Sequence, residues 1–175
     1  PVSDCLAREA LSLLGANIHK ACKTPDDRDA RGAMLLGSML AGMAFANAPV
    51  GAVHALAYPL GGHFHVPHGL SNAMLLPHVM EYNASHAKVE YAELAQIIFP
   101  NLAGKSDDAR IAGMIDAFKA LGPELGMDPR ISSAGVNHNH LPMLAEDAMK
   151  QTRLLINNPR EMTFDAAREI YEKAL

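Results

Sequence analysis

Residues 32–80, GAMLLGSMLAGMAFANAPVGAVHALAYPLGGHFHVPHGLSNAMLLPHVM, contain no Asp, Glu, Lys or Arg. The same run holds five of the nine histidines, at His54, His63, His65, His68 and His78. Burying an unpaired charge is costly, whereas an imidazole can stay neutral and form hydrogen bonds through either ring nitrogen. The run is therefore predicted to be the interior of a helical fold, with chemistry built into it.

The composition of the whole chain favours an all-α fold. Only 5% of the 175 residues are aromatic, whereas Ala, Leu, Met and Gly are abundant. Strands favour β-branched and aromatic residues, and no segment shows convincing strand alternation. A chain of this length buries roughly two-thirds or more of its unfolded surface. We therefore predict one helical domain over residues 1–175, built as a multi-helix bundle.

Charge and motif content narrow the functional classes. The net charge of −4 and the pI near 6.1 give no electrostatic basis for binding nucleic acid. Two cysteines are too few for a disulfide framework, which favours a reducing cytoplasm. Residues 32–53 are long and apolar enough to raise a membrane-spanning alternative, but they lack a basic flank at the far end, so a central bundle helix is favoured. No GxGxxG or Walker motif is present, so no nucleotide-phosphate loop is predicted.

Periodicity and capping residues predict the helix boundaries. Caps are expected at Ser3, at Asp26 or Asp27, at Ser106 and at Thr163. Pro59 with the following glycine pair should end a short helix, and Pro67 should open the next one. The predicted helices cover residues 3–23, 26–48, 51–58, 67–80, 84–99, 106–121, 141–150 and 163–175, with a looser region at 122–139.

Two histidines flank the predicted bend between the short helix and its successor. His54 near the end of one helix and His68 at the start of the next are expected to converge across it. Two imidazoles suit iron or zinc, but a stable site usually needs further ligands, often a carboxylate. Because residues 32–80 contain none, those ligands must come from elsewhere in the chain, from solvent or from sequence outside it. The alternative, in which the histidines only bond to backbone, stays open.

The same residues carry a resemblance to a known family. The motifs AGMAFANA at 41–48, GAVHALA at 51–57, PLGG at 59–62 and PHGLSNA at 67–73 closely resemble the iron-containing alcohol dehydrogenases. The interval between the two histidines, its glycines and its prolines all match. Residues 3–14, and Asn158-Pro159-Arg160 with Thr163, extend the resemblance over nearly the whole chain.

The resemblance implies a two-domain architecture of which this chain is one part. It implies the C-terminal helical domain of the dehydroquinate synthase-like, iron-containing alcohol dehydrogenase fold, without the N-terminal α/β domain that binds the nucleotide. His54 and His68 then correspond to the third and fourth ligands of Fe²⁺ or Zn²⁺. The first two ligands, an Asp and a His, are expected upstream of Pro1. The implied reaction is hydride transfer between an alcohol or aldehyde and NAD or NADP.

Two further residues gain roles from the resemblance. Tyr58 stands where some members place a second histidine near the nicotinamide, and its phenol, with an unperturbed pKa near 10, is a poorer proton shuttle than imidazole. Phe45 matches a position that lines the substrate pocket, although a core aromatic is an equal alternative. No residue is predicted to bind the dinucleotide. His63 and His65 are predicted to lie in the turn between the ligands, and His78, His86, His138 and His140 to be solvated or capping residues.

Several alternatives stay open at this point. The chain begins at Pro1, which is consistent either with a fragment or with loss of an initiator Met. It is predicted to be inactive alone and to self-associate through exposed apolar surface, and a homo-oligomer is expected. The other functional readings are an autonomous helical metal-binding or scaffold module, a zinc glycerol dehydrogenase-like enzyme, and a lyase resembling dehydroquinate synthase. The choices between iron and zinc, and between NAD and NADP, also stay open.

Overall fold

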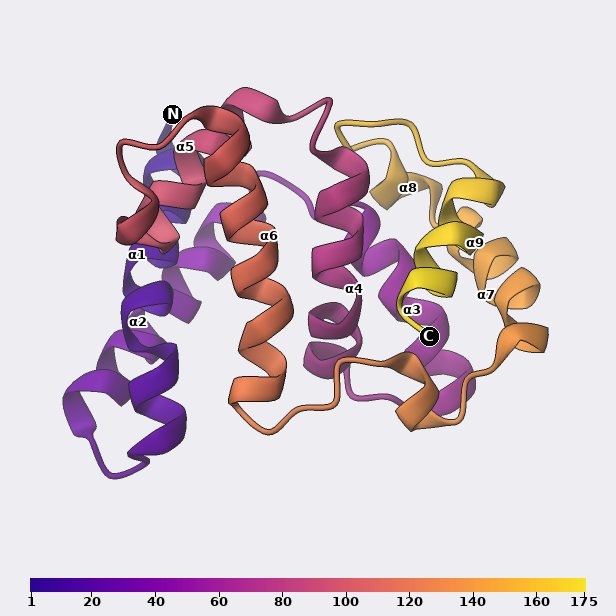
Figure 1. The fold of residues 1–175 in the computed structure, drawn as a ribbon, viewed down its shortest axis with the longest axis horizontal. Helices are drawn as coiled ribbons and strands as arrows, with labels where there is room; N and C mark the ends of the chain where they lie inside the picture. Colours follow the sequence, from indigo (N-terminus) through magenta and orange to yellow (C-terminus); the bar gives the residue numbers. More distant parts are fainter. The chain divides into compact units, whose positions relative to one another are not determined.

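The computed structural model describes residues 1–175 and consists of helices and turns without a strand (Figure 1). This confirms the predicted all-α class. The chain divides into two compact units, residues 1–49 with 88–114, and residues 50–87 with 115–175. The helices are α1 (Val2–Lys23), α2 (Arg28–Phe45), α3 (Ala52–Phe64), α4 (His68–Asn83), α5 (Lys88–Ile98), α6 (Asp107–Glu124), α7 (Leu141–Met149), α8 (Thr152–Leu155) and α9 (Phe164–Lys173), with short 3-10 turns η1 (Pro100–Leu102), η2 (Ile131–Ala134) and η3 (His138–His140).

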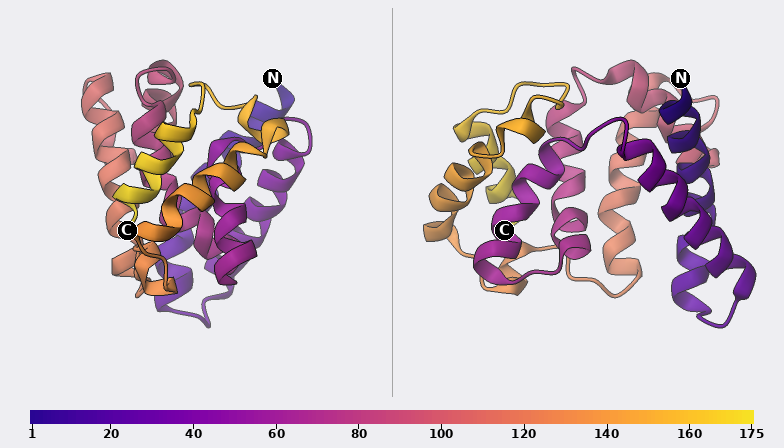
Figure 2. Two further views of the ribbon diagram at one scale, coloured as in Figure 1. Left: turned by 90° about the vertical axis from the view of Figure 1, so that its right-hand side faces the viewer. Right: turned by 180° about the vertical axis from the view of Figure 1, so that it is seen from behind.

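The first unit is organised by the hairpin of α1 and α2, which run side by side (Figure 2). Asp27 caps α2 as predicted, because its carboxylate accepts a 2.8 Å hydrogen bond from Ala30 N. Gly37 allows the close approach of the two helices, since a Cβ there would lie 2.9 Å from the Leu14 side chain. The α1 helix also contacts α5, and an ion pair of 2.5 Å joins Arg8 to Glu93.

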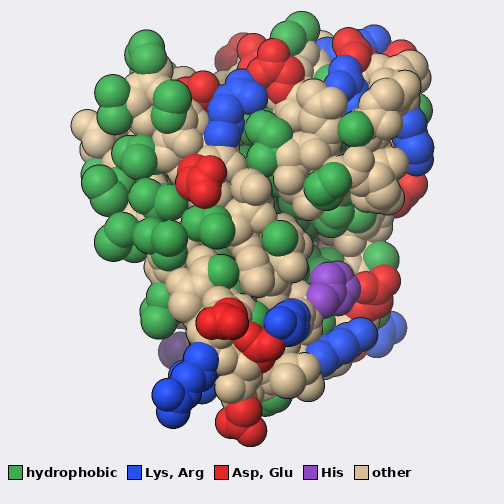
Figure 3. Space-filling view, turned by 90° about the vertical axis from the view of Figure 1, so that its left-hand side faces the viewer, with side chains coloured by type: hydrophobic (Ala, Val, Ile, Leu, Met, Phe, Trp, Pro, Cys, Tyr) green, Lys and Arg blue, Asp and Glu red, His purple; other side chains and the backbone are tan.

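One face of α2 is exposed, contrary to the prediction that the whole charge-free run is interior. Its large side chains are Leu35, Leu36, Met39, Met43 and Phe45, with exposed fractions of 74, 45, 55, 49 and 57%. We call these five residues the α2 stripe. Hydrophobic side chains gather on the left of the face shown in Figure 3. The prediction is wrong here because a charge-free sequence does not specify which surface, if any, covers the helix. No part of this chain covers this face of α2. No helix of the chain combines the length and apolar character needed to cross a membrane.

The second unit buries the large aliphatic side chains in the centre of α3 and α4. The α3 helix packs against α4, α7 and α8, while α9 packs against α4 and α7 (Figure 1). Leu56 and Leu60 of α3 and Leu75 of α4 are fully buried, as is Tyr171 of α9. Apolar burial of this kind is the main favourable term in folding, and it holds together the two helices that carry His54 and His68.

The third helix is longer than predicted. It does not stop at Tyr58 but continues through Pro59 to Phe64. Proline removes a backbone donor and crowds the preceding turn, which locally favours a helix end. Here the buried Tyr171 hydroxyl donates a 2.6 Å hydrogen bond to the Leu56 carbonyl oxygen beside the proline. Burial and this bond from α9 therefore stabilise a helix that local rules would terminate.

Other boundaries were predicted with mixed success. Ser106 and Thr163 cap α6 and α9, since their hydroxyls accept hydrogen bonds from Ala109 N at 3.4 Å and Ala166 N at 3.2 Å. The prediction for Ser3 is wrong, because α1 already begins at Val2. The fifth helix begins later than predicted, at Lys88 and not at residue 84, and its Val89 is 64% exposed. The short helix α8 was not predicted.

Candidate metal centre

The turn between α3 and α4 brings the two predicted ligands together. His65 ends α3 in a left-handed conformation, with φ of 55°, which reverses the chain direction. Val66 N then donates to the Leu60 carbonyl oxygen at 3.3 Å, so the segment runs back along α3 before α4 begins at His68. The buried Ser71 hydroxyl fixes this segment through bonds of 3.3 and 3.1 Å to the carbonyl oxygens of Val66 and Pro67.

His54 and His68 converge in the structure. Their ring centroids lie 5.1 Å apart, with an angle of 53° between the ring planes. His54 belongs to the first turn of α3 and not to the end of a helix as predicted, so the returning segment is what closes the distance. Two imidazoles at this separation can present nitrogen donors to one cation. The roles of His54 and His68 as ligands stay predictions.

Burial favours the neutral form of the first of these rings. His54 is half-buried, and this burial lowers the pKa of its imidazole, with a smaller lowering from the nearby His68. His68 itself is exposed. Because only the neutral imidazole has a free nitrogen lone pair, a lowered pKa favours the form that can bind a metal.

A cluster of hydrogen bonds connects the residues before α3 and the end of α4 to Asn157 and Asn158. Asn83 and Asn158 exchange side-chain hydrogen bonds of 2.9 and 2.8 Å, and Asn83 is buried. Asn157 Nδ2 donates to the Val50 carbonyl oxygen at 3.1 Å, and Gly51 lies against Asn158. The Asn158-Pro159-Arg160 motif thus holds the backbone just before His54. Sequence reasoning noted the motif but assigned it no such role.

Arg160 continues the same cluster toward α4. Its guanidinium donates a 3.0 Å hydrogen bond to the Tyr82 carbonyl oxygen and lies 4.0 Å from the centroid of the Tyr82 ring. A guanidinium over an aromatic face is attracted by the ring quadrupole. Because Tyr82 precedes Asn83 at the end of α4, these contacts reinforce the attachment of the motif to that helix.

Tyr58 lies beside the histidine pair. Its ring centroid is 6.5 Å from that of His54 and 6.2 Å from that of His68, and the side chain is 36% exposed. The i to i+4 spacing on α3 places it on the same face as His54. Tyr58 is therefore positioned to border a ligand at the pair, while its catalytic role stays a prediction.

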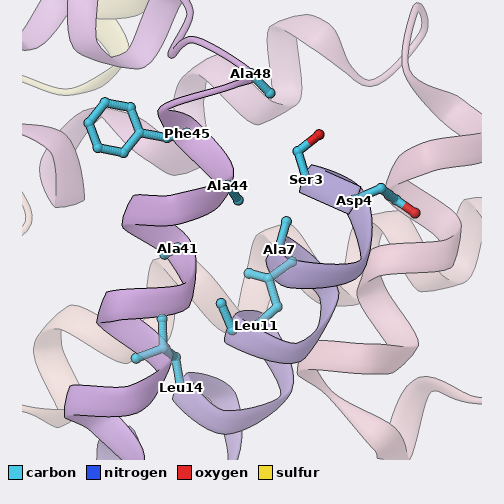
Figure 4. A pocket seen from close by; sticks show the side chains of 10 residues that line it. Ser3, Asp4, Ala7, Leu11, Leu14, Ala41, Ala44, Phe45 and Ala48 are labelled. Atoms are coloured by element: carbon cyan, nitrogen blue, oxygen red, sulfur yellow. The ribbon is translucent and has the colours of Figure 1, made fainter. Parts of the chain in front are cut away.

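Phe45 lies in the first unit, at the end of α2. It lines an apolar groove of about 440 Å³ between α1 and α2, together with Ala41, Ala44 and the α1 residues Ala7 and Leu11. Its ring points away from the α1 side chains in Figure 4. The environment suits an apolar contact, and the assignment of Phe45 to a substrate pocket stays a prediction.

Three of the other histidines differ in their surroundings. His63, predicted to lie in the turn, belongs to α3, and its Nε2 lies 2.5 Å from the Asp147 carboxylate of α7. No sequence signal pointed to this long-range pair. His140 completes a capping box with Asn137, which confirms a capping role. His78 is half-buried, contrary to the solvated or capping role expected of it, and burial lowers its pKa.

The side chains near the histidine pair show how many ligands this chain could supply to a metal ion. Two imidazoles match the nitrogen ligands that iron and zinc accept. No group of three or more His, Cys, Asp or Glu side chains that could hold a metal ion occurs in residues 1–175. The pair therefore fits a divalent metal as part of a coordination sphere, and further donors have to come from outside these residues or from solvent.

Sequence comparison places the chain among known proteins. The model of the Fe-containing alcohol dehydrogenase family, C-terminal, matches residues 1–175. This chain belongs to the iron-containing alcohol dehydrogenase family. It is 37% identical over 174 residues to long-chain-alcohol dehydrogenase 1 of Geobacillus thermodenitrificans, and 35% identical over 174 residues to lactaldehyde reductase of Escherichia coli (strain K12). Each match covers 99% of this chain and 44% of the relative, so the chain spans less than half of either protein.

Solved structures of family members have the same fold. A 1,3-propanediol oxidoreductase matches the whole chain with a TM-score of 0.95 at 35% identity, over 46% of its own length. An alcohol dehydrogenase from Oenococcus oeni matches the whole chain with a TM-score of 0.93 at 34% identity, over 45% of its length. The helical arrangement described above is therefore that of a C-terminal region in the iron-containing alcohol dehydrogenase family, as the sequence resemblance predicted.

Proposed function

We propose that this chain is the metal-binding helical portion of an oxidoreductase that transfers hydride between an alcohol or aldehyde and NAD or NADP. The convergence of His54 and His68, with ring centroids 5.1 Å apart, is the observation that carries the proposal. The relatives support the reaction class, since they are named as long-chain-alcohol dehydrogenase, lactaldehyde reductase and 1,3-propanediol dehydrogenase. The dinucleotide would be bound by the remainder of a longer protein.

The residues of this chain have defined tasks in that reaction. A bound Fe²⁺ or Zn²⁺ would supply a Lewis acid that polarises the substrate oxygen. His54 and His68 would contribute two imidazole nitrogen donors, and the buried apolar side chains of α3 and α4 would limit water on one side of the site. Tyr58, whose ring lies 6.5 Å from that of His54, would border the substrate, and its hydroxyl would be available as a hydrogen-bond donor. For Phe45, the proposal of a substrate contact rests on the family resemblance alone.

Metal titration of the purified 175-residue chain tests the ligand assignment. We expect zinc binding by calorimetry at one site, with affinity reduced at least tenfold in His54→Ala and in His68→Ala, because each removes one of two donors. His138→Ala is the matched control, since His138 is exposed and its Nδ1 lies 3.2 Å from the Glu172 carboxylate, with no ring contact to His54 or His68. Wild-type affinity in both ligand variants would contradict the proposal.

Activity provides a second test. The isolated chain should show little NAD-dependent oxidation of alcohols, because it spans less than half of its relatives and contains no dinucleotide-binding motif. Robust turnover by the purified chain would refute this part of the proposal. Tight zinc binding by the chain alone, in place of the weak binding expected from two protein donors, would instead favour the autonomous metal-binding module.

A further inference from the structure

Asn72 contacts His68 in two ways. It lies one helical turn after His68 on α4, and its Nδ2 donates a 2.8 Å hydrogen bond to the His68 carbonyl oxygen. The same Nδ2 atom lies 3.5 Å from His68 Nδ1 and 3.4 Å from His68 Nε2. The amide is therefore fixed to the backbone of His68 while it touches the ring of the same residue.

The nearly equal distances from Asn72 Nδ2 to the two ring nitrogens show where the amide lies relative to the imidazole plane. An atom in the ring plane at these distances from both nitrogens would overlap the ring carbon atoms, so Asn72 Nδ2 must lie over the face of the imidazole. An N–H group over an aromatic face is weakly attractive. This contact restricts the plane of the ring, and it leaves the in-plane direction of each nitrogen free for a metal or a hydrogen-bond partner.

Stability alone gives little reason for an asparagine at this position. Asn72 Oδ1 is buried and has no hydrogen-bond partner among residues 1–175. A buried acceptor without a partner is unfavourable, and asparagine is also a weaker helix former than leucine. An apolar side chain of similar size would avoid both costs, whereas it would not provide the amide that contacts the ring.

We propose that Asn72 is a positioning residue that holds the His68 ring in the plane from which one nitrogen can reach the site shared with His54. This inference rests on the proposed function, in which His68 binds the metal. Outer groups that orient ligating histidines typically contribute 10–100-fold to metal affinity. Asn72 acts from the helix that carries His68, so the restraint is independent of how any other part of the protein is placed.

The test compares Asn72 with a matched asparagine. Asn17 on α1 also donates from Nδ2 to the carbonyl oxygen four residues earlier, Leu13, at 2.8 Å, and it is likewise half-buried. Asn72→Leu and Asn17→Leu therefore remove the same backbone contact, but only the first removes the ring contact. The measurements are zinc affinity by calorimetry, urea unfolding of the metal-free chain, and the side-chain ¹⁵N and ¹³C resonances of His68.

The expected result distinguishes a role of Asn72 in orienting the His68 ring from a role in folding stability alone. Asn72→Leu should bind zinc about tenfold more weakly while its urea midpoint stays equal to or above that of the wild type, and its His68 ring resonances should shift without metal. Asn17→Leu should keep wild-type zinc affinity. Unchanged affinity and unchanged ring resonances in Asn72→Leu, or losses of affinity and stability that are equal in the two variants, would overturn the proposal. Failure of the proposed function is distinguishable, because His68→Ala would then also bind zinc normally.

Discussion

The charge-free residues 32–80 fold into two regions with opposite surroundings. On α2, Leu35 is 74% exposed and the rest of the α2 stripe is at least 45% exposed. On α3 and α4, Leu56, Leu60 and Leu75 are fully buried. The sequences of the two regions are equally free of charge, so burial within this chain is decided by the helices that pack around them.

An apolar run can therefore be either a core covered by other helices of the chain or an exposed surface. In the second unit, α7 and α9 cover α3 and α4, and the result is a rigid support for the histidine pair. In the first unit, α1 contacts one side of α2 and leaves the stripe open. A large exposed apolar patch is typical of an interaction surface. We therefore expect different roles for the two regions: α3 and α4 would position the histidine pair, and the α2 stripe would associate with another surface.

The largest expected effect is the difference in stability loss between two leucine truncations, one in each region. Leu75→Ala should lower the free energy of unfolding by about 2–5 kcal/mol, because it removes fully buried methyl groups and leaves a cavity. Leu35→Ala should change it by less than about 0.5 kcal/mol, since the side chain is largely exposed. Urea unfolding of both variants is the measurement. Equal losses would show that the α2 stripe is buried in solution.

The α2 stripe should also drive self-association of the isolated chain. We expect sedimentation velocity to show dimers or larger species that increase with protein concentration. Replacing Leu35 and Met39 with Gln should weaken this association about tenfold or more, because it places polar groups in the middle of the stripe. A wild-type chain that remains a monodisperse monomer would exclude association through α2.

A smaller effect is expected for the bond that supports α3 at its proline. Tyr171→Phe removes the 2.6 Å hydrogen bond to the buried Leu56 carbonyl oxygen and should cost about 1 kcal/mol of stability. Tyr82→Phe is the control, since its hydroxyl also donates to a carbonyl oxygen, that of Glu161, but in an exposed setting. Urea unfolding should show the greater loss for Tyr171→Phe. A greater loss for Tyr82→Phe would contradict the support of α3 by α9.

The smallest expected effect is a pH dependence at Asp147. The ammonium of Lys150, and to a lesser degree His63, lower the pKa of this carboxyl below its usual 3.8 in the folded chain. A lowered pKa means that the carboxylate stabilises folding above pH 3.8 and that this contribution disappears as the pH falls through the folded value. Asp147→Asn should therefore show a flatter loss of stability below pH 4. Parallel wild-type and variant curves in acid urea titrations would contradict this.

Much of the candidate metal centre is predictable because its signals are local. The interval between His54 and His68, with the prolines and glycines inside it, predicted a bend that brings two imidazoles together, and the structure confirms their convergence. The class of the fold followed from composition and helical spacing. The structure corrected the end of α3, because a local rule treats Pro59 as a terminator and cannot include a hydroxyl from Tyr171 more than a hundred residues later.

The parts that escaped prediction depend on contacts between distant segments. The His63–Asp147 pair and the Asn83–Asn158 exchange join residues 84 and 75 positions apart, and neither has a spacing signature. The ring contact of Asn72 has helical spacing, but asparagine four residues after histidine is too common a pattern to identify it. Exposure of α2 could not be predicted either, since apolar character does not specify the surface that meets it.

We propose that His54 and His68 share one metal ion, and NMR of the histidine side chains distinguishes a shared ion from binding at a single ring. Zinc would be added to the ¹⁵N-labelled 175-residue chain while the ring nitrogens of all nine histidines are followed. We expect the resonances of His54 and His68 to change together and to saturate at one equivalent of zinc, while those of His138 do not move. Changes confined to only one ring of the pair, or equal changes at His138, would contradict it.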